Sequence, residues 1–257
     1  MFDAAVHPRP RPSGRLCLVT TDVPDLGTIL SVWAHPDDES YCCAGLMAVA
    51  LRAGHRVVCV TATRGELGST DEQRWPPGPP LAEVRTRELM ACLDEIGVTE
   101  HHWLDYPDGG CADVDPAEAI ARIRALAEDV QPDTVLTFGP DGSTYHPDHI
   151  AVSRWTTEAV RGSGANLLYA SVTPEWQNAV STVVDPQTVM MTDDEPIVTP
   201  VDELAVYAQL DGELLDMKYR AMLCQESQVA PLIALGGADF YRQLLAEEAF
   251  RDGWAEA

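Results

Sequence analysis

Residues 29–39, Ile-Leu-Ser-Val-Trp-Ala-His-Pro-Asp-Asp-Glu, constrain the fold of this chain more than any other stretch. The first six of these residues are almost all apolar, which is typical of a buried strand in a parallel sheet with both faces covered. Pro36 ends the strand, and the three acids that follow it fall at the expected start of a helix, where the helix dipole favours negative charge. The stretch therefore predicts a strand, a tight turn and a helix over about residues 41–53.

The same alternation of strand and helix is repeated along the first two thirds of the chain. Short apolar runs that end in polar loops alternate with longer segments whose apolar residues recur at helical spacing. This pattern predicts an α/β fold with a doubly wound, mostly parallel sheet. Further strands are expected at residues 56–61, 102–104, 134–138 and 167–172, and further helices at 81–96, 115–130 and 147–160.

Beyond residue 172 the alternation fades, and a smaller antiparallel β and helical C-terminal part is expected there. Residues 1–14 are rich in Pro and Arg and are expected to be a loose tail, followed by an edge strand over 15–20. We expect one domain over 15–257, with a core at about 28–172 and the C-terminal part at about 173–257. Within that last part we expect short antiparallel β pieces over 182–199 and helices over 201–224 and 240–250.

The net charge limits the partners that the chain can bind. The sequence has 41 acidic and 17 basic residues, which give a net charge of −24 at pH 7. Nucleic acids and anionic membranes require basic patches, so we expect neither as a partner. No apolar stretch reaches the length of a transmembrane helix, so no membrane insertion is expected. The expected partner is a small molecule, and the sequence does not indicate an oligomeric state.

The cysteines and the N-terminus indicate the compartment. Seven cysteines, an odd number, are scattered mostly through apolar segments, as expected for buried free thiols and not for a disulfide framework. The N-terminus has no apolar core of a secretory signal. We therefore expect a cytoplasmic protein.

A second cluster, His146-Pro-Asp-His149, repeats the organisation of the first. Each cluster follows a predicted strand and precedes a predicted helix, and ligands of open α/β sheets bind at the carboxyl ends of the strands. His35 and Asp38 are three residues apart across a tight turn, so both can face one metal ion. With His149 they make a set of two nitrogens and one oxygen, which is the ligand count of catalytic zinc with an open fourth position.

Three further residues complete the chemistry for hydrolysis of an amide. Asp37 lies between two expected ligands and is free to act as general base toward a metal-activated water. His146 is expected to stabilise the oxyanion and to protonate the leaving amine. Asp148 is expected to orient one of the histidines. Zn²⁺ is the expected cofactor and another divalent metal such as Fe²⁺ is the alternative, because such sites accept several divalent ions.

These motifs resemble the PIG-L/LmbE family of zinc-dependent N-deacetylases. The resemblance covers most of the chain and is carried first by residues 34–39 and by residues 146–149. Shorter matches lie at 63–66, 85–89, 105–109 and 218–228. It implies a Rossmann-like fold and an enzyme that removes an acyl group from an amino sugar. The sugar is typically N-acetylglucosamine linked to inositol, a peptide antibiotic or another carrier.

The resemblance also implies roles for individual residues. It places His35, Asp38 and His149 on zinc, with Asp37 as base and His146 as electrostatic partner. Arg85 and Asp108 would hold sugar hydroxyls, and Glu66 and Tyr145 complete the candidate substrate-binding set, Tyr145 as an oxyanion candidate beside His146. Family members often carry a histidine at the position of Gln225, and some carry a tyrosine one residue earlier than Tyr145.

Other interpretations stay open at this point. Within the hydrolases, the chain could be an amidase of mycothiol-type S-conjugates. From a different class, it could be a non-catalytic Rossmann-like protein that binds a sugar or a nucleotide, although such a protein needs no general base. Arg85 could instead form a surface ion pair with Glu88, and Asp108 could be a turn residue. The acceptor sugar is not specified, because the loops at 66–80, 105–115 and 139–146 would select it.

Overall fold

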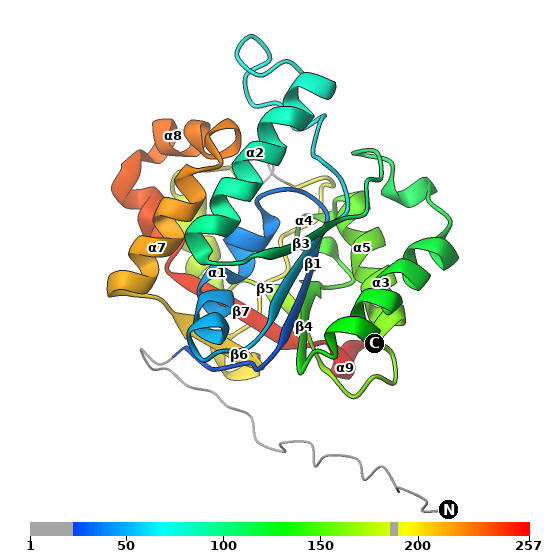
Figure 1. The fold of residues 1–257 in the computed structure, drawn as a ribbon. Coiled ribbons are helices and arrows are strands. Elements are labelled where there is room, and N and C mark those ends of the chain that lie inside the picture. The colour runs from blue at the N-terminus through cyan, green and yellow to red at the C-terminus, as the bar shows by residue number, and fades with distance from the viewer. Residues whose placement is uncertain (1–22, 186–189) are drawn as a thin grey trace, which may run out of the picture.

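The computed structural model describes residues 23–185 and 190–257, which contain one mixed β-sheet covered by helices (Figure 1). The strands in these residues are β1 (Ile29–Trp33), β2 (Val57–Thr61), β3 (Glu100–Trp103), β4 (Thr134–Phe138), β5 (Asn166–Ser171), β6 (Val206–Gln209) and β7 (Glu247–Asp252). Their order in the sheet is β3-β2-β1-β4-β5-β7-β6. The first five strands pair in parallel, whereas β7 is antiparallel to both β5 and β6.

Helices cover both faces of this sheet. Those in the described residues are α1 (Asp38–Arg52), α2 (Pro79–Ile96), α3 (Pro116–Val130), α4 (Gly142–Tyr145), α5 (Pro147–Val160), α6 (Pro174–Ser181), α7 (Gly212–Leu223), α8 (Glu226–Leu244) and α9 (Gly253–Glu256). On one face α3 packs against α5, and on the other α1, α2 and α7 pack together with α8 (Figure 1). The predicted α/β class is confirmed, with its mostly parallel, doubly wound sheet and antiparallel C-terminal strands.

The order of the strands reverses beside β1. β1 pairs in parallel with β2 on one side and with β4 on the other, so Ile29 lies opposite both Val57 and Thr134. The loops that follow β1 and β4 therefore leave the same edge of the sheet from adjacent strands. In open α/β sheets this reversal is the place where ligands bind.

The three central strands consist of residues that are buried throughout. All five residues of β1, of β2 and of β4 are buried. Strands covered on both faces need apolar side chains at successive positions, and this is why the sequence shows continuous apolar runs there. The predicted strand at 134–138 and helix at 147–160 have the observed bounds. The first helix begins earlier than predicted, at Asp38, because Asp38 and Glu39 form its first turn.

The predicted helix over 201–224 is wrong in its first half. Val206–Gln209 is the edge strand β6, and α7 begins only at Gly212 after a turn. The apolar residues recur at a spacing compatible with one long helix, but pairing with β7 satisfies the backbone of 206–209 as a strand. Tertiary pairing thus overrides the local pattern.

The last predicted helix, over 240–250, is wrong in its second half. α8 ends at Leu244, and Glu247–Asp252 forms β7 between β5 and β6. Pro231 and Gly237 both lie inside α8, and Gly237 has a φ of 82° there. The antiparallel pieces expected over 182–199 are not found in the described residues of that stretch, where one isolated parallel bridge joins Val198 to Val172 after α6.

Some expectations are not tested by the described residues. The tail over 1–14 and the edge strand over 15–20 lie outside them, and the division into two parts near residue 172 stays a prediction. None of the described helices has both the length and the apolar character needed to cross a membrane.

A buried ion pair joins the C-terminal part to α1. Lys218 Nζ lies 2.8 Å from Glu248 Oε1, and both side chains are completely buried. Glu248 also accepts hydrogen bonds from the backbone N–H of Gly45 and of Leu46, which are free because α1 is kinked at Cys43. Lys218 donates to the backbone oxygen of Tyr41 in addition. Removing one partner of such a pair strongly destabilises the fold, because the other charge would be left buried without a partner.

We expect Lys218→Met to lower the free energy of unfolding by about 3–5 kcal/mol, the usual cost of leaving one charge of a buried pair without its partner. Urea denaturation of the variant and the wild type measures this difference. Adding Glu248→Gln to Lys218→Met should recover part of the loss, because it removes the unpaired charge. A loss below about 1 kcal/mol, the scale of an exposed pair, would contradict this account.

The stability of the fold should also depend on His101 in β3. Its Nε2 lies 3.0 Å from Thr61 Oγ1, and burial lowers the pKa of His101 to about 4. The unfolded chain, with an ordinary imidazole pKa near 6.5, binds a proton between about pH 6.5 and 4 that the folded chain does not bind. The free energy of unfolding should therefore fall as the pH is lowered through this window. Urea denaturation at pH 7, 6 and 5 should show that the free energy of unfolding falls less for His101→Gln than for the wild type. An equal fall in the two proteins would contradict the role of His101.

Candidate metal centre and active site

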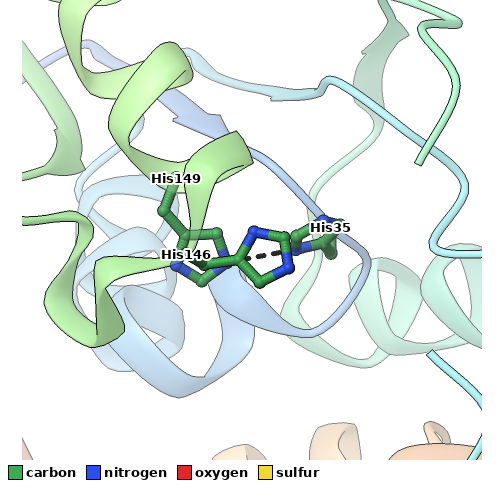
Figure 2. Close-up of side chains that lie close together, drawn as sticks. All are labelled: His35, His146 and His149. Atoms are coloured by element: carbon green, nitrogen blue, oxygen red, sulfur yellow. Dashed lines mark hydrogen bonds between the residues drawn. The ribbon is translucent and has the colours of Figure 1, made fainter. Parts of the chain in front are cut away.

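The two histidine clusters meet at the edge of the sheet where β1 and β4 end. His35 follows β1, whereas His146 directly precedes α5 and His149 lies in its first turn. The three imidazoles lie close together, contributed by segments far apart in the sequence (Figure 2). The His35 ring centroid is 4.8 Å from that of His146 and 5.1 Å from that of His149.

His35 and His149 face each other with one nitrogen each. His35 Nδ1 lies 3.1 Å from His149 Nε2. The other nitrogen of each ring has an oxygen partner: His35 Nε2 is 3.0 Å from Asp108 Oδ1 and 3.2 Å from Asp148 Oδ2, and His149 Nδ1 is 2.9 Å from the Gly142 carbonyl oxygen. When both outer nitrogens donate to these oxygens, the two facing nitrogens present lone pairs to one point, as metal-ligating histidines do.

The carboxylate of Asp38 completes this group. Asp38 Oδ2 is 3.8 Å from His35 Nδ1, and Asp38 Oδ1 is 3.7 Å from His149 Nε2. Asp38 Oδ2 also accepts the backbone N–H of His35 at 2.8 Å, which fixes the carboxylate across the turn. Ligand atoms about 2.0–2.1 Å from a tetrahedral zinc ion lie about 3.3 Å apart, so these three donors fit one such cation.

The pKa values of the histidines reflect the same arrangement. Burial by itself lowers the pKa of His35, but hydrogen bonds with Asp108 and Asp148 and the charge of Asp38 outweigh it and raise the pKa to about 10. Burial lowers the pKa of His149 to about 4. The neighbouring carboxylates therefore favour a positive charge at His35, whereas burial favours the neutral ring of His149.

His146 lies beside this pair but is oriented differently. Its Nδ1 accepts the backbone N–H of Asp148 at 3.2 Å, so the side chain caps the start of α5. Burial lowers the pKa of His146, which favours the neutral ring. Its donor atom also lies in one group with those of His35 and His149, within 4.8 Å of both. The third ligand of a cation could thus be Asp38 or His146, and the sequence pattern favours Asp38.

Asp37 lies next to the candidate ligands His35, Asp38 and His149, and its own backbone conformation is unusual. Its φ is 108°, a value that residues other than glycine rarely adopt. Its carboxylate is 3.4 Å from Arg85 Nη2. Burial raises the pKa of Asp37 to about 7, although the charge of Arg85 opposes the rise. A carboxyl group with a pKa near neutrality is suited to accept and release a proton.

The candidate substrate residues surround the same place, but three of them already have protein partners. Asp108 accepts the backbone N–H of Leu67 at 2.8 Å besides its contact with His35, and its own N–H donates to Glu66 Oε1 at 3.0 Å. Arg85 is 3% exposed and donates to the backbone oxygens of Gly65 and Pro36.

Of the alternatives considered, the ion pair between Arg85 and Glu88 is not observed, whereas Asp108 does lie in a turn, closed by the hydrogen bond from the Gly110 N–H to the Pro107 oxygen. Glu88, offered as an ion-pair partner of Arg85, instead accepts from the Ser227 backbone N–H at 2.8 Å. Tyr145 has a φ of 58° directly before His146. The roles of Arg85, Asp108, Glu66 and Tyr145 toward a substrate stay predictions.

Asp148 is fully buried among backbone donors. It accepts the N–H groups of Gly109 at 2.7 Å and Cys111 at 3.0 Å, and its Oδ2 lies 3.2 Å from His35 Nε2. The hydrogen bond with His35 and those backbone N–H groups lower its pKa against the opposing effect of burial. The anionic form of Asp148 can therefore orient His35, and that role stays a prediction.

Two residues at this site were not recognised as functional candidates from the sequence. Glu39 is completely buried beside Asp37, and Gln225 reaches it from the junction of α7 and α8. Helical spacing contains a signal for Glu39, because it falls on the same side of α1 as the buried Cys43, Leu46 and Ala50. The contact with Gln225 has no signal in the sequence.

Comparison with known proteins identifies the family of this chain. The sequence profile of PIG-L, described as GlcNAc-PI de-N-acetylase, matches residues 30–160, just over half of the 257 residues. The chain belongs to the PIG-L family. The matched region runs from β1 to the end of α5, so it contains both histidine clusters of this PIG-L protein.

Individual PIG-L relatives agree with this result. A 1D-myo-inositol 2-acetamido-2-deoxy-alpha-D-glucopyranoside deacetylase of Kineococcus radiotolerans is 36% identical in an alignment 188 residues long, which covers 62% of this chain and 52% of that protein. The deacetylase of the same name from Mycolicibacterium gilvum is 30% identical over 240 residues, covering 82% of this chain and 84% of that protein. The match thus spans about half the length of the first relative and most of the second.

A solved structure supports the fold. The N,N'-diacetylchitobiose deacetylase from Pyrococcus horikoshii superposes with a TM-score of 0.59 at 21% sequence identity and covers 90% of this chain and 85% of its own. At this identity the likeness concerns the fold alone.

The metal group can be tested directly by titrating zinc into chelator-treated protein and measuring heat. We expect one equivalent to bind, and we expect Asp38→Ala to weaken binding on the order of 100-fold or more, because a lost ligand costs more than a lost outer partner. His146→Ala should weaken it less than about tenfold. His102→Ala, at an exposed histidine of β3, is the matched control. A stronger effect of His146→Ala than of Asp38→Ala would assign the third ligand to His146.

Proposed function

We propose that this PIG-L protein is a metal-dependent hydrolase that removes an acyl group, typically acetyl, from an N-acetylglucosamine-type amino-sugar conjugate. One observation carries the proposal: side-chain atoms of His35, Asp38 and His149 converge beside the carboxyl group of Asp37, whose pKa burial raises to about 7. The names of the Kineococcus and Mycolicibacterium relatives, both deacetylases of an acetamido sugar linked to inositol, support the substrate class.

His35, Asp38 and His149 would hold the cation, with Zn²⁺ the first candidate and Fe²⁺ the alternative. When bound, such a cation polarises the acyl carbonyl and makes a nearby water more acidic. The residues present fit it, because two imidazole nitrogens and a carboxylate converge while the outer nitrogen of each ring is held by an oxygen.

Asp37 and His146 would move the protons. As general base, Asp37 takes a proton from the attacking water, and Arg85 at 3.4 Å stabilises its anionic form before that step. His146 lies beside His35 and His149, where its ring would stabilise the oxyanion and, once protonated, deliver a proton to the leaving amine nitrogen. Loss of that proton to the amine makes the C–N bond cleavage favourable.

The sugar would lie against the loops after β2, β3 and β4. Glu66 and Asp108 are linked by a hydrogen bond at this rim, and Arg85 and Tyr145 lie on neighbouring segments. The exposed side chain of Leu67 lies next to Asp108 and would contact the apolar face of a ring. We expect the partner to be a small molecule and the protein to act in the cytoplasm.

The test is release of acetate from a panel of N-acetylglucosamine derivatives by protein stripped with chelator and reloaded with zinc. Turnover should disappear on stripping and return with the metal, and Asp37→Asn should lower kcat by roughly 10²–10⁴-fold, the usual contribution of a general base. Asp37→Asn should keep its one equivalent of zinc, because the ligands are untouched.

The outcomes separate the alternatives. Zinc-dependent cleavage of mycothiol-type S-conjugate amides, without cleavage of any acetylated sugar, would assign the protein to the amidases instead. Ligand binding without turnover on either panel, unaffected by Asp37→Asn, would indicate a non-catalytic sugar- or nucleotide-binding protein. Failure to bind any divalent metal would refute the proposal.

A further inference from the structure

Glu39 has no role in the proposed reaction, although its side chain contacts the backbone of Asp37. Its side chain is completely buried in the first turn of α1, between the sheet and the junction of α7 and α8. A buried carboxylate without partners is costly, but the oxygens of Glu39 have several. Oε2 accepts the backbone N–H of Asp37 at 3.1 Å, and Oε1 accepts from Ser40 Oγ and from Gln225 Nε2 at 3.0 Å.

The bond from Asp37 to Glu39 fixes an unfavourable backbone conformation. With φ at 108° and ψ at −33°, Asp37 lies in a region that costs a residue other than glycine about 1–3 kcal/mol. The surrounding bonds hold it there, because its carbonyl oxygen accepts from the N–H of Ser40 at 3.0 Å and of Tyr41 at 2.9 Å. On the preceding residue, Arg85 donates to the Pro36 oxygen. Glu39 supplies the acceptor for the Asp37 N–H.

Gln225 in turn orients Glu39. Its side chain is fully buried, and its Nε2 donates to Glu39 Oε1, whereas its Oε1 finds no hydrogen-bond partner among the described residues. Burying an amide oxygen without a hydrogen-bond partner costs free energy. We therefore infer that the important contact of Gln225 is the hydrogen bond that its amide nitrogen donates. The hydrogen bond from Gln225 Nε2 to Glu39 Oε1 fixes the Glu39 carboxylate so that Oε2 faces the Asp37 N–H.

We propose that Glu39 and Gln225 are positioning residues that hold Asp37 in its left-handed backbone conformation and so aim its carboxylate at the group of His35, Asp38 and His149. This inference rests on the role of Asp37 as general base given under Proposed function. Glu39 acts through the backbone of Asp37 and touches no reacting atom. What it supplies is an acceptor in one place, and its negative charge is not required.

This distinction gives the test. In Glu39→Gln the amide oxygen still accepts from the Asp37 N–H, and the amide nitrogen can donate to the unpaired Gln225 Oε1. In Glu39→Met the shape is kept and the acceptor is lost. We expect Glu39→Met to lower kcat for acetate release on the order of 10–100-fold with KM little changed, because small misplacement of a catalytic group has effects of this size. Glu39→Gln should restore most of the lost turnover.

Three further variants separate this role from general damage to the fold. Gln225→Met should lower kcat less than Glu39→Met, and Gln225→His, which keeps a ring N–H donor, should lower it less than Gln225→Met. Glu247→Met is the matched control, because Glu247 also accepts a backbone N–H, that of Thr173 at 3.1 Å, but at the start of α6. It should lower stability without lowering kcat.

Two readouts besides turnover complete the experiment: the zinc equivalents bound by each variant and a crystal structure of Glu39→Met. We expect one equivalent throughout and a negative φ at Asp37 in Glu39→Met. Equal losses in Glu39→Gln and Glu39→Met, or an unchanged φ at Asp37, would overturn the positioning role. If Asp37→Asn loses turnover and Glu39→Met keeps it, the positioning role alone fails. If Asp37→Asn keeps turnover, the proposed function fails.

Discussion

The candidate site depends on the parallel pairing of β1 with β4 at the point where the strand order reverses. This pairing brings the ends of two strands, distant in the sequence, to neighbouring positions on one edge of the sheet. His35 lies two residues after β1, whereas His149 lies in the first turn of α5, after a loop that contains α4, and their facing nitrogens are 3.1 Å apart. Without that register the two clusters would be two ordinary helix starts.

The C-terminal strand β7 supports both turns from behind. Glu248 in β7 accepts the freed N–H groups of the kinked α1, and Gly45 permits this approach because a side chain there would lie 2.8 Å from Leu210. Arg251 in the same strand lies 2.8 Å from Asp141, whose other oxygen caps the turn before His146. Buried charges are expensive, so these two contacts specify one arrangement of the strands more than they add stability.

The sequence predicts the parallel core closely and the C-terminal part poorly. Continuous apolar runs and helical periodicity are local signals, and they suffice where each strand is covered on both faces, as in β1, β2 and β4. β6 and β7 have mixed composition, and they become strands by pairing with each other and, for β7, with β5. The helical interpretation of 240–250 fails because local propensity is similar for both structures there and the free edge of β5 decides between them.

For the site, the sequence by itself determined the chemistry. Two His-Pro-Asp motifs at strand ends are local patterns, and they name the candidate ligands and the candidate base before any contact is known. The tertiary structure alone decided which atoms meet: which nitrogen of His35 faces His149, that Asp108 lies against His35, and that Gln225 reaches Glu39. These contacts join residues far apart in the chain, and they are set by strand register and helix packing, which no short stretch of sequence encodes.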